Sequence, residues 1–278
     1  MIFAFFFFIN IASSGGHLDQ WDGMEAFFVT ESMVLKHTAK LDPSVPSVKE
    51  TNFNVTYTVN ANTWLQTGKG PDTNNTTLEP VLEPVYTVRS LLLSASAVPF
   101  YYLSLLLSIP PLATIGLLVN SMFISLICVI VFCFSLDIHG SKKVAFLLSV
   151  IIGVCSFLWP FNTTFWMQPL QALTLISSAY FIYKSLHYNK PLMCHYTVLK
   201  HDKGGFFAGL GGLCLGLSVF SNPTSTVFVP AFVIYSIYAM RHNKKNLLLF
   251  LSMLGIALLS LGFLNNIRFG GFTNFGYG

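Results

Sequence analysis

One histidine and three carboxylates follow the first apolar stretch of the chain. They are His17, Asp19, Asp22 and Glu25. At helical spacing the three acids recur every three residues and share one face. Like charges held close together raise the pKa of one carboxyl group, as a general base requires. The same residues could instead cap the start of a helix, or hold a divalent ion, and their spacing leaves these three interpretations open.

A second candidate site surrounds Arg268, near the other end of the chain. The arginine is followed by Phe269, Gly270 and Gly271. A guanidinium group can bind a phosphate through two parallel hydrogen bonds, and glycines let the backbone approach a ligand closely. The alternative is an arginine that only extends to the membrane interface. Arg89 is the other arginine that we expect on the same side of the membrane.

The composition of the chain predicts a membrane protein. Of its 278 residues, 53% are hydrophobic and 9% charged, and the mean hydropathy is +0.63. Soluble domains carry about 25% charged residues. These values exclude an ordinary soluble globule and a disordered chain. The net charge of +4 is spread over loops, and this distribution does not indicate a nucleic-acid-binding protein. We find no Walker loop, GxSxG or HExxH motif, which leaves ATP hydrolysis, serine hydrolase and zincin chemistry without support.

The apolar segments predict an all-α bundle of about seven spans. Residues 1–13 form the first span, although a signal peptide is the alternative, and their short length predicts that the true helix begins before Met1. Residues 91–109 are expected to lie along the interface and to end at Pro110-Pro111. Glycines between Gly205 and Gly216 predict a helix-packing face. The remaining spans are expected at residues 114–136, 144–160, 170–183, 205–221, 226–240 and 247–264.

The few charges predict the orientation of the bundle in a cell membrane. Basic residues gather around 142–143, 184–203 and 241–245, and loops of this kind are cytoplasmic. Nine of the eleven acids come before residue 90. We therefore expect residues 14–113 to form an extracytoplasmic loop with short interfacial helices, residues 114–264 a six-helix bundle, and residues 265–278 a second extracytoplasmic segment. N-x-[ST] sequons favour the same orientation, at Asn54, Asn74, Asn75 and Asn162.

Together these residues resemble membrane glycosyltransferases of the GT-C fold, in the group of protein O-mannosyltransferases, aminoarabinose transferases and related archaeal or bacterial enzymes. The resemblance covers most of the chain, and no single motif is specific. In this sequence Gly23 stands where the family usually has a glutamate, and Arg89-Ser90 where glycines are common. Family members also continue beyond the length of this chain, so it is expected to be truncated at the C-terminus. The segments that carry the resemblance are Asp19 to Glu25, Val98 to Tyr101, Gln168 to Leu170, Gly209 to Pro230, and Asn266-x-Arg268-Phe269-Gly270 through Gly276-Tyr277.

The resemblance implies transfer of a sugar from a polyprenyl phosphate to a protein, lipid or glycan acceptor on the outer face. Asp22 best matches the catalytic aspartate, with Asp19 as the alternative. The resemblance and the charges together suggest that Arg268, Glu25, Arg89 and Tyr277 bind the substrate or its phosphate. No cofactor is indicated with certainty, and a divalent metal on His17 and the three acids is left open. The rival hypothesis is a non-catalytic membrane subunit or lipid carrier whose acidic loop binds a partner.

Overall fold

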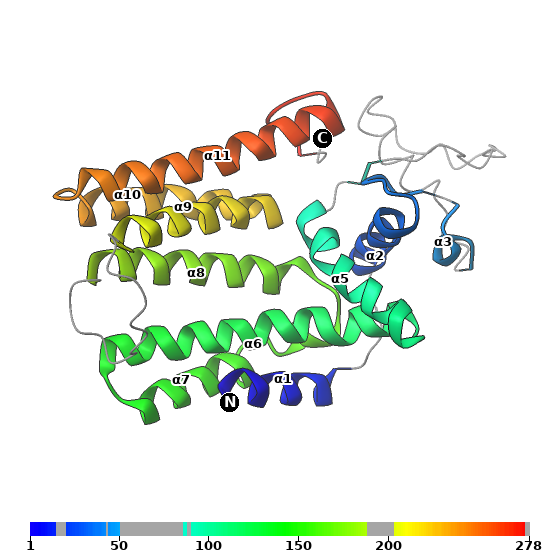
Figure 1. Ribbon diagram of the computed structural model, residues 1–278, viewed down its shortest axis with the longest axis horizontal. Helices are drawn as coiled ribbons and strands as arrows, with labels where there is room; N and C mark the ends of the chain where they lie inside the picture. The colour runs from blue at the N-terminus through cyan, green and yellow to red at the C-terminus, as the bar shows by residue number, and fades with distance from the viewer. Residues whose placement is uncertain (15–20, 43, 51–85, 88–89, 188–202, 276–278) are drawn as a thin grey trace, which may run out of the picture.

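The computed structural model of the chain describes residues 1–14, 21–42, 44–50, 86–87, 90–187 and 203–275 (Figure 1). Within these ranges the regular secondary structure is helical, without strands, which confirms the predicted all-α class. Two short 3-10 helices, η1 and η2, precede α8 and α10. The helices are α1 (Ile2–Ser13), α2 (Trp21–Leu35), α3 (Pro46–Glu50), α5 (Leu91–Leu107), α6 (Pro111–His139), α7 (Lys142–Val154), η1 (Pro160–Thr163), α8 (Met167–His187), α9 (Lys203–Ser221), η2 (Pro223–Phe228), α10 (Val229–Ala239) and α11 (Lys244–Phe269).

Three of these helices are long and apolar enough to cross a bilayer. They are α6 with 29 residues, the 18 residues of α9 that begin at Gly204, and α11 with 26 residues. A crossing needs about 20 residues, because the hydrocarbon core is about 30 Å thick. These three helices support the prediction of a membrane protein. The number of seven crossings stays a prediction.

The other predicted spans correspond to shorter or more polar helices. α1, α7 and α10 have 12, 13 and 11 residues, and 13 residues of helix extend only about 20 Å. α7 ends at Val154, and the chain then turns before η1 begins at Pro160. Pro223 begins η2, and α10 has Pro230 in its first turn. Proline has no N–H to donate, so it favours the start of a new helix over the continuation of an old one.

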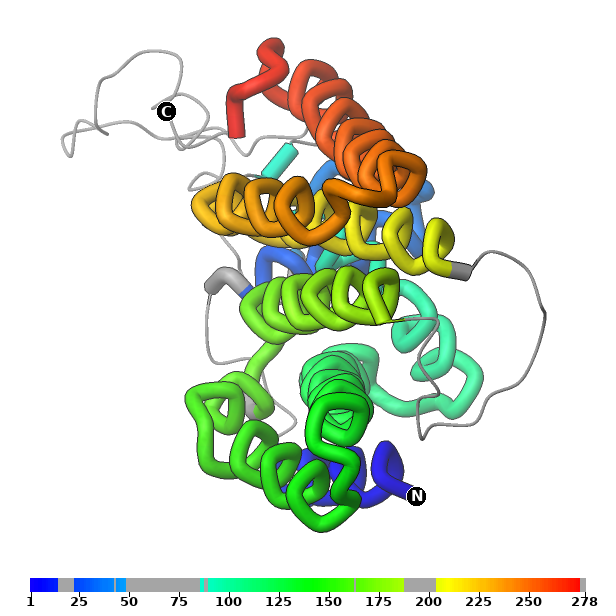
Figure 2. Tube along the Cα trace, turned by 90° about the vertical axis from the view of Figure 1, so that its left-hand side faces the viewer, coloured from blue at the N-terminus to red at the C-terminus, as the bar shows by residue number. Residues whose placement is uncertain are grey.

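The bundle helices pack side by side in an order that differs from the chain order. α6 contacts α1, α7 and α8, α8 contacts α9, and α9 contacts α11, as Figures 1 and 2 show. The glycine face of α9 makes the last of these contacts possible. A Cβ atom on Gly212 would lie 2.1 Å from the Phe250 carbonyl oxygen. The predicted packing role of these glycines is therefore confirmed for the α9–α11 pair.

Helices α2, α3 and α5 form a lobe at one end of the bundle (Figure 1). We call the end with these helices the lobe end. The lobe has its own core, in which Phe27 and Phe28 of α2 pack with Tyr101 of α5 and with Ile115 near the start of α6. The lobe is thereby packed onto the bundle.

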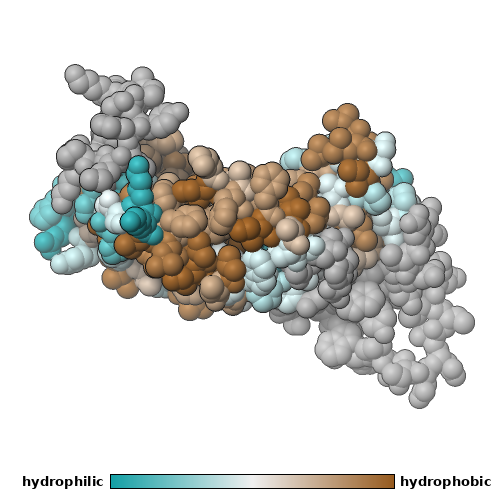
Figure 3. Space-filling view, turned by 90° about the horizontal axis from the view of Figure 1, so that it is seen from below, coloured by the Kyte–Doolittle hydropathy of each residue, from teal (hydrophilic) through white to brown (hydrophobic). Residues whose placement is uncertain are grey.

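Helix α5 ends in an exposed apolar turn before α6 begins. Ser108 has a left-handed φ of 55°, and Pro110-Pro111 then starts α6. The side chains of Leu105, Leu106 and Leu107 are 49%, 81% and 54% exposed. Apolar surface also runs along the bundle face shown in Figure 3, with hydrophilic atoms at the end far from the lobe. Exposed apolar surface of this kind marks a membrane or protein interface, and the long apolar helices favour a membrane.

Candidate functional site

The structure describes some of the predicted site residues and not others. Asp22 is the second residue of α2, at the lobe end. Glu25 lies one turn further along the same helix and is 8% exposed. Arg268 lies in the last turn of α11, at the same end. Four of the predicted residues lie outside the described residues: His17, Asp19, Arg89 and Tyr277.

The first turn of α2 packs directly against the segment that precedes α8. A Cβ atom on Gly23 would lie 2.8 Å from the carbonyl oxygen of Phe165, closer than real side chains come. Only glycine allows this approach without a shift of the backbone. Gly23 therefore places the start of α2 against the backbone of Phe165.

A crevice lies beside this contact and is lined by residues of α2, α5 and the start of α8. Its walls include Ala26, Ser90, Phe165, Trp166 and Gln168. It offers about 10 Å³ of space, which is room for about one water molecule or one hydroxyl group. The indole N–H of Trp166 and the amide oxygen of Gln168 are buried and have no hydrogen-bond partner among the described residues. One group that both accepts and donates, such as a hydroxyl, would satisfy the two atoms together.

Hydrogen bonds hold α5 between α2 and α9 at this crevice. The Ser94 hydroxyl donates to the Ala26 carbonyl at 3.0 Å, and the Thr30 hydroxyl donates to the Ser94 carbonyl at 3.1 Å. At the start of α5, the Ser90 hydroxyl donates to the Phe220 carbonyl at 3.1 Å. These bonds fix the start of α5 to α2 and to α9.

The guanidinium of Arg268 binds the chain segment that leads into α5. It donates to the Thr87 carbonyl oxygen and lies over the ring of Phe269, 4.7 Å from its centroid. Gly270, with φ of 72°, ends α11 directly after it. Arg268 is therefore half-buried beside residue 87, at the end of the bundle that carries α2. The structure brings Arg268 and the start of α2 to one end of the bundle (Figure 1).

Gln171 of α8 joins the start of that helix to the segment around η2. Its amide nitrogen donates to the Ser225 hydroxyl at 2.8 Å, and its amide oxygen accepts from Asn222 at 3.1 Å. Gln171 lies one turn after Gln168 on α8, so these bonds fix η2 against the start of α8, next to the crevice.

A buried carboxylate in the lobe was missed by the sequence reasoning. Glu31 is 2% exposed, and its oxygens accept hydrogen bonds from the Tyr101 hydroxyl at 3.0 Å and from the Ser47 hydroxyl at 3.1 Å. Burial, the neighbouring charge and the hydrogen bond together raise the pKa of Tyr101. Glu31 ties α2 to α3 and α5. In the sequence, Glu31 is distinguished only as an acidic residue among the apolar residues of the same segment.

The sequon at Asn162 is buried, which removes it as an argument for orientation. Its side chain is 0% exposed. The amide nitrogen donates to the Asn10 carbonyl and to the Ser13 hydroxyl, and the amide oxygen accepts from Ser121 at 2.9 Å. An acceptor for a glycan must be accessible, so the expected surface role of Asn162 is wrong. Its amide instead joins η1 to α1 and α6.

The part of the chain that the structure describes holds no cluster of three or more His, Cys, Asp or Glu residues suited to a metal ion. His17 and Asp19, two members of the predicted group, lie outside that part. Comparisons of the chain with models of protein families, with curated proteins and with solved structures find no match. A function must therefore be argued from the lobe end itself.

Proposed function

We propose that the chain is an integral membrane glycosyltransferase of the GT-C type. It would move a sugar from a polyprenyl phosphate to an acceptor on the outer face of a cell membrane. One observation carries the proposal: the lobe end gathers the start of α2 with Asp22, a crevice with an unpartnered donor and acceptor, and Arg268. The reaction requires a base, a site for a hydroxyl and a cation, and the lobe end carries residues for each.

The proposal includes seven crossings, with the lobe outside. The basic residues at the start of α7, at the end of α8 and in the turn before α11 support this orientation, because these three places lie at the end opposite the lobe (Figure 1). Positive loops remain on the cytoplasmic side. The short helices α1, α7 and α10 would count as spans together with the segments next to them. The exposed leucines at the end of α5 would enter the outer interface.

The proposed reaction is one displacement at the anomeric carbon of the donor. The carboxylate of Asp22, or of Asp19, accepts the proton of the acceptor hydroxyl. The acceptor oxygen bonds to the anomeric carbon, and the bond between that carbon and the phosphate oxygen breaks. The electron pair leaves with the phosphate, and the positive charge of Arg268 stabilises it. Glu25, Arg89 and Tyr277 are proposed to bind the substrate around this centre.

The crevice supplies a place for one hydroxyl of the substrate. The Trp166 indole N–H would donate to its oxygen, and the Gln168 amide oxygen would accept its proton. An unpaired buried donor or acceptor costs about 1–3 kcal/mol, so a hydroxyl that pairs with both atoms gains affinity. Water can do the same in the free protein, and the substrate would displace it.

The test measures transfer from polyprenyl-phosphate sugars in proteoliposomes that contain the purified chain. Asp22→Asn preserves shape and removes the base, so the transfer rate should fall roughly 10²–10⁴-fold. Asp202→Asn, which makes the same change in the sequence between α8 and α9, is the matched control and should retain the wild-type rate. Binding of the polyprenyl phosphate should survive Asp22→Asn and weaken in Arg268→Gln.

Two results would reject the proposal. One is a wild-type chain that neither transfers sugar nor binds polyprenyl phosphate. The other is full transfer after Asp19 and Asp22 are both replaced by alanine, which would favour the rival hypothesis of a membrane subunit without catalysis.

A further inference from the structure

A groove lies between α6, α8 and α10, away from the lobe site. It encloses about 360 Å³. Its walls are almost entirely apolar and include Phe134 of α6, Ala179 and Tyr183 of α8, and Ala231, Phe232 and Tyr235 of α10.

The groove exists because α10 is short and stands at the edge of the bundle. It follows the 3-10 helix η2 and its main packing partner is that same segment. Figure 2, which looks along the bundle, shows α10 beside α9 and above α8. Its outward side chains Ile234 and Ile237 are 67% and 48% exposed. In a membrane protein such a surface is covered by lipid, so the groove adjoins hydrocarbon.

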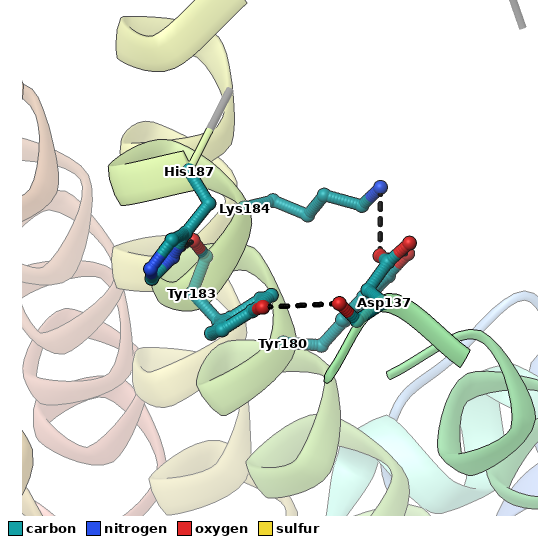
Figure 4. A network of polar contacts seen from close by, with 5 residues as sticks. All are labelled: Asp137, Tyr180, Tyr183, Lys184 and His187. Carbon is teal, nitrogen blue, oxygen red and sulfur yellow. Dashed lines mark hydrogen bonds and ion pairs between the residues drawn. The ribbon is translucent and has the colours of Figure 1, made fainter. Parts of the chain in front are cut away.

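One end of the groove is polar and basic. The Tyr183 hydroxyl donates to the Asp137 carbonyl at 3.4 Å, and the ring of His187 stacks on Tyr183 with 4.3 Å between centroids. Lys184 is 13% exposed and pairs with the Asp137 carboxylate at 2.8 Å. Figure 4 shows these groups together where α8 passes the end of α6. The lysine ammonium has three donors, and the ion pair occupies only one of them.

We propose that this groove binds one acyl chain of a membrane glycerophospholipid, with the lipid phosphate beside Lys184 and His187. Charge complementarity selects this occupant, because the apolar walls suit the acyl chain and the basic end suits the phosphate. The loops that extend this end add further cations at Lys142, Lys143 and Arg241, which is where headgroups of the cytoplasmic leaflet would lie. The inference rests on the membrane location of the chain and is independent of any transfer activity.

Photolabelling tests the inference directly. The full chain is placed in phosphatidylcholine nanodiscs with a trace of phosphatidylglycerol that carries a diazirine in one acyl chain. After irradiation, mass spectrometry should find the label concentrated on the groove segments of α8 and α10. The exposed side chains of α11, such as Leu259, should carry only the lower label of surrounding bulk lipid.

Filling the groove should remove the label. Ala231→Trp and, separately, Ala179→Phe add bulk to its walls, so labelling of the groove should fall to the level of the surrounding bulk lipid. Leu259→Trp is the matched control, because Leu259 lies on α11 and is 69% exposed. It should leave groove labelling unchanged. Retention on size exclusion identifies any variant that fails to fold, and two separate filling variants provide a second measurement.

Three results would overturn the inference. The first is an even label around all lipid-facing helices. The second is wild-type groove labelling in both folded filling variants. The third is displacement of the label by an equimolar amount of polyprenyl phosphate, which would assign the groove to an isoprenoid chain instead.

Discussion

Gly23 illustrates how a single residue decides the geometry of the candidate site. Its neighbour Asp22 is a candidate general base. A glycine in the first turn of a helix, by contrast, is expected to lower the stability of that helix. The structure gives the reason for the glycine, because a Cβ atom there would meet the Phe165 carbonyl oxygen at 2.8 Å. The absence of a side chain at this position lets α2 start against the loop before α8.

Replacement of Gly23 should therefore destabilise the lobe end. Gly23→Val forces the backbones of α2 and the loop apart, and overpacking of this kind costs about 1–3 kcal/mol. Thermal unfolding in detergent would measure the change. Gly255→Ala on α11 is the control, because a Cβ atom there has nothing within 4 Å and alanine favours helix. A Gly23→Val chain as stable as Gly255→Ala would contradict the contact.

Tyr101 allows a test by pH at a position outside the three helices that can span the membrane. Burial and the Glu31 carboxylate raise its pKa above the ordinary value of 10. The stability that this gives is complete below pH 10 and is lost at higher pH, because the unfolded chain releases its proton first. Tyr101→Phe should cost about 1–3 kcal/mol near neutral pH, as expected for a hydrogen bond to a carboxylate. Above pH 10 that difference should shrink by up to about 1.4 kcal/mol per pH unit.

Unfolding curves of the wild-type chain and Tyr101→Phe at several pH values would measure this difference. Other groups titrate in the same range, so the informative quantity is the difference between the two proteins. A difference that stays constant from neutral to alkaline pH would contradict the raised pKa.

Residue types alone identified Asp22 and Arg268, but not the residues whose role depends on distant partners. Glu31 is an example, since its partners Ser47 and Tyr101 lie 16 and 70 residues further along the chain. The contact of Arg268 with the Thr87 carbonyl spans 181 residues. No periodicity or motif encodes such pairs, because each depends on how the helices finally pack.

At the scale of elements, the long apolar helices were predictable and the interrupted ones were not. The prediction of 114–136 became α6 at Pro111–His139, and 247–264 became α11 at Lys244–Phe269. Their apolar runs continue without interruption. Residues 144–160 are also apolar, yet α7 ends at Val154. Hydropathy does not distinguish a helix from an apolar turn, and the turn here is fixed by packing against α6.

That packing depends on buried amides that join α1, α6 and η1. The Asn162 amide pairs with Asn10, Ser13 and Ser121, and the Asn10 amide donates to Ser125 at 3.2 Å. Asn120 adds a bond to the Phe161 carbonyl at 3.0 Å. Buried polar groups gain by pairing in apolar surroundings, so these bonds favour one placement of the first helix against α6, although the amide oxygens of Asn10 and Asn120 have no hydrogen-bond partner among the described residues.

Loss of the Asn162 amide should loosen the first helix. Asn162→Ala leaves the Asn10 carbonyl and two hydroxyls with fewer partners, and each unsatisfied buried group costs about 1–3 kcal/mol. The unfolding temperature in detergent should fall, and hydrogen exchange in α1 should rise while exchange in α9 and α11 stays unchanged. Asn266→Ala, at an exposed position on α11, is the control and should have little effect. Equal behaviour of the two variants would contradict the network.

At the scale of the whole molecule, the two ends of the bundle differ both in charge and in structure. The lobe end carries α2, α3 and α5, and the opposite end carries the basic turns between α6 and α7 and between α10 and α11. The sequence predicted this separation from the positions of its few charges. It could not predict which polar side chains of the lobe end would be accessible, because that depends on the packing of loops onto helices.

Glycosylation mapping tests both the proposed orientation and the burial of Asn162. When the chain is made in endoplasmic-reticulum microsomes, the sequons at Asn54, Asn74 and Asn75 should receive glycans, because the lobe is proposed to lie on the lumenal side. Asn162 should receive none, since its side chain is 0% exposed. Lys245→Thr creates a new sequon at Asn243, in the basic turn before α11, and provides a control for the opposite side. Gel shifts reversed by glycosidase, compared across single Asn→Gln variants, would measure each site. A glycan at Asn243 would reverse the proposed orientation, whereas a glycan at Asn162 would contradict its burial, so the two failures are distinguishable.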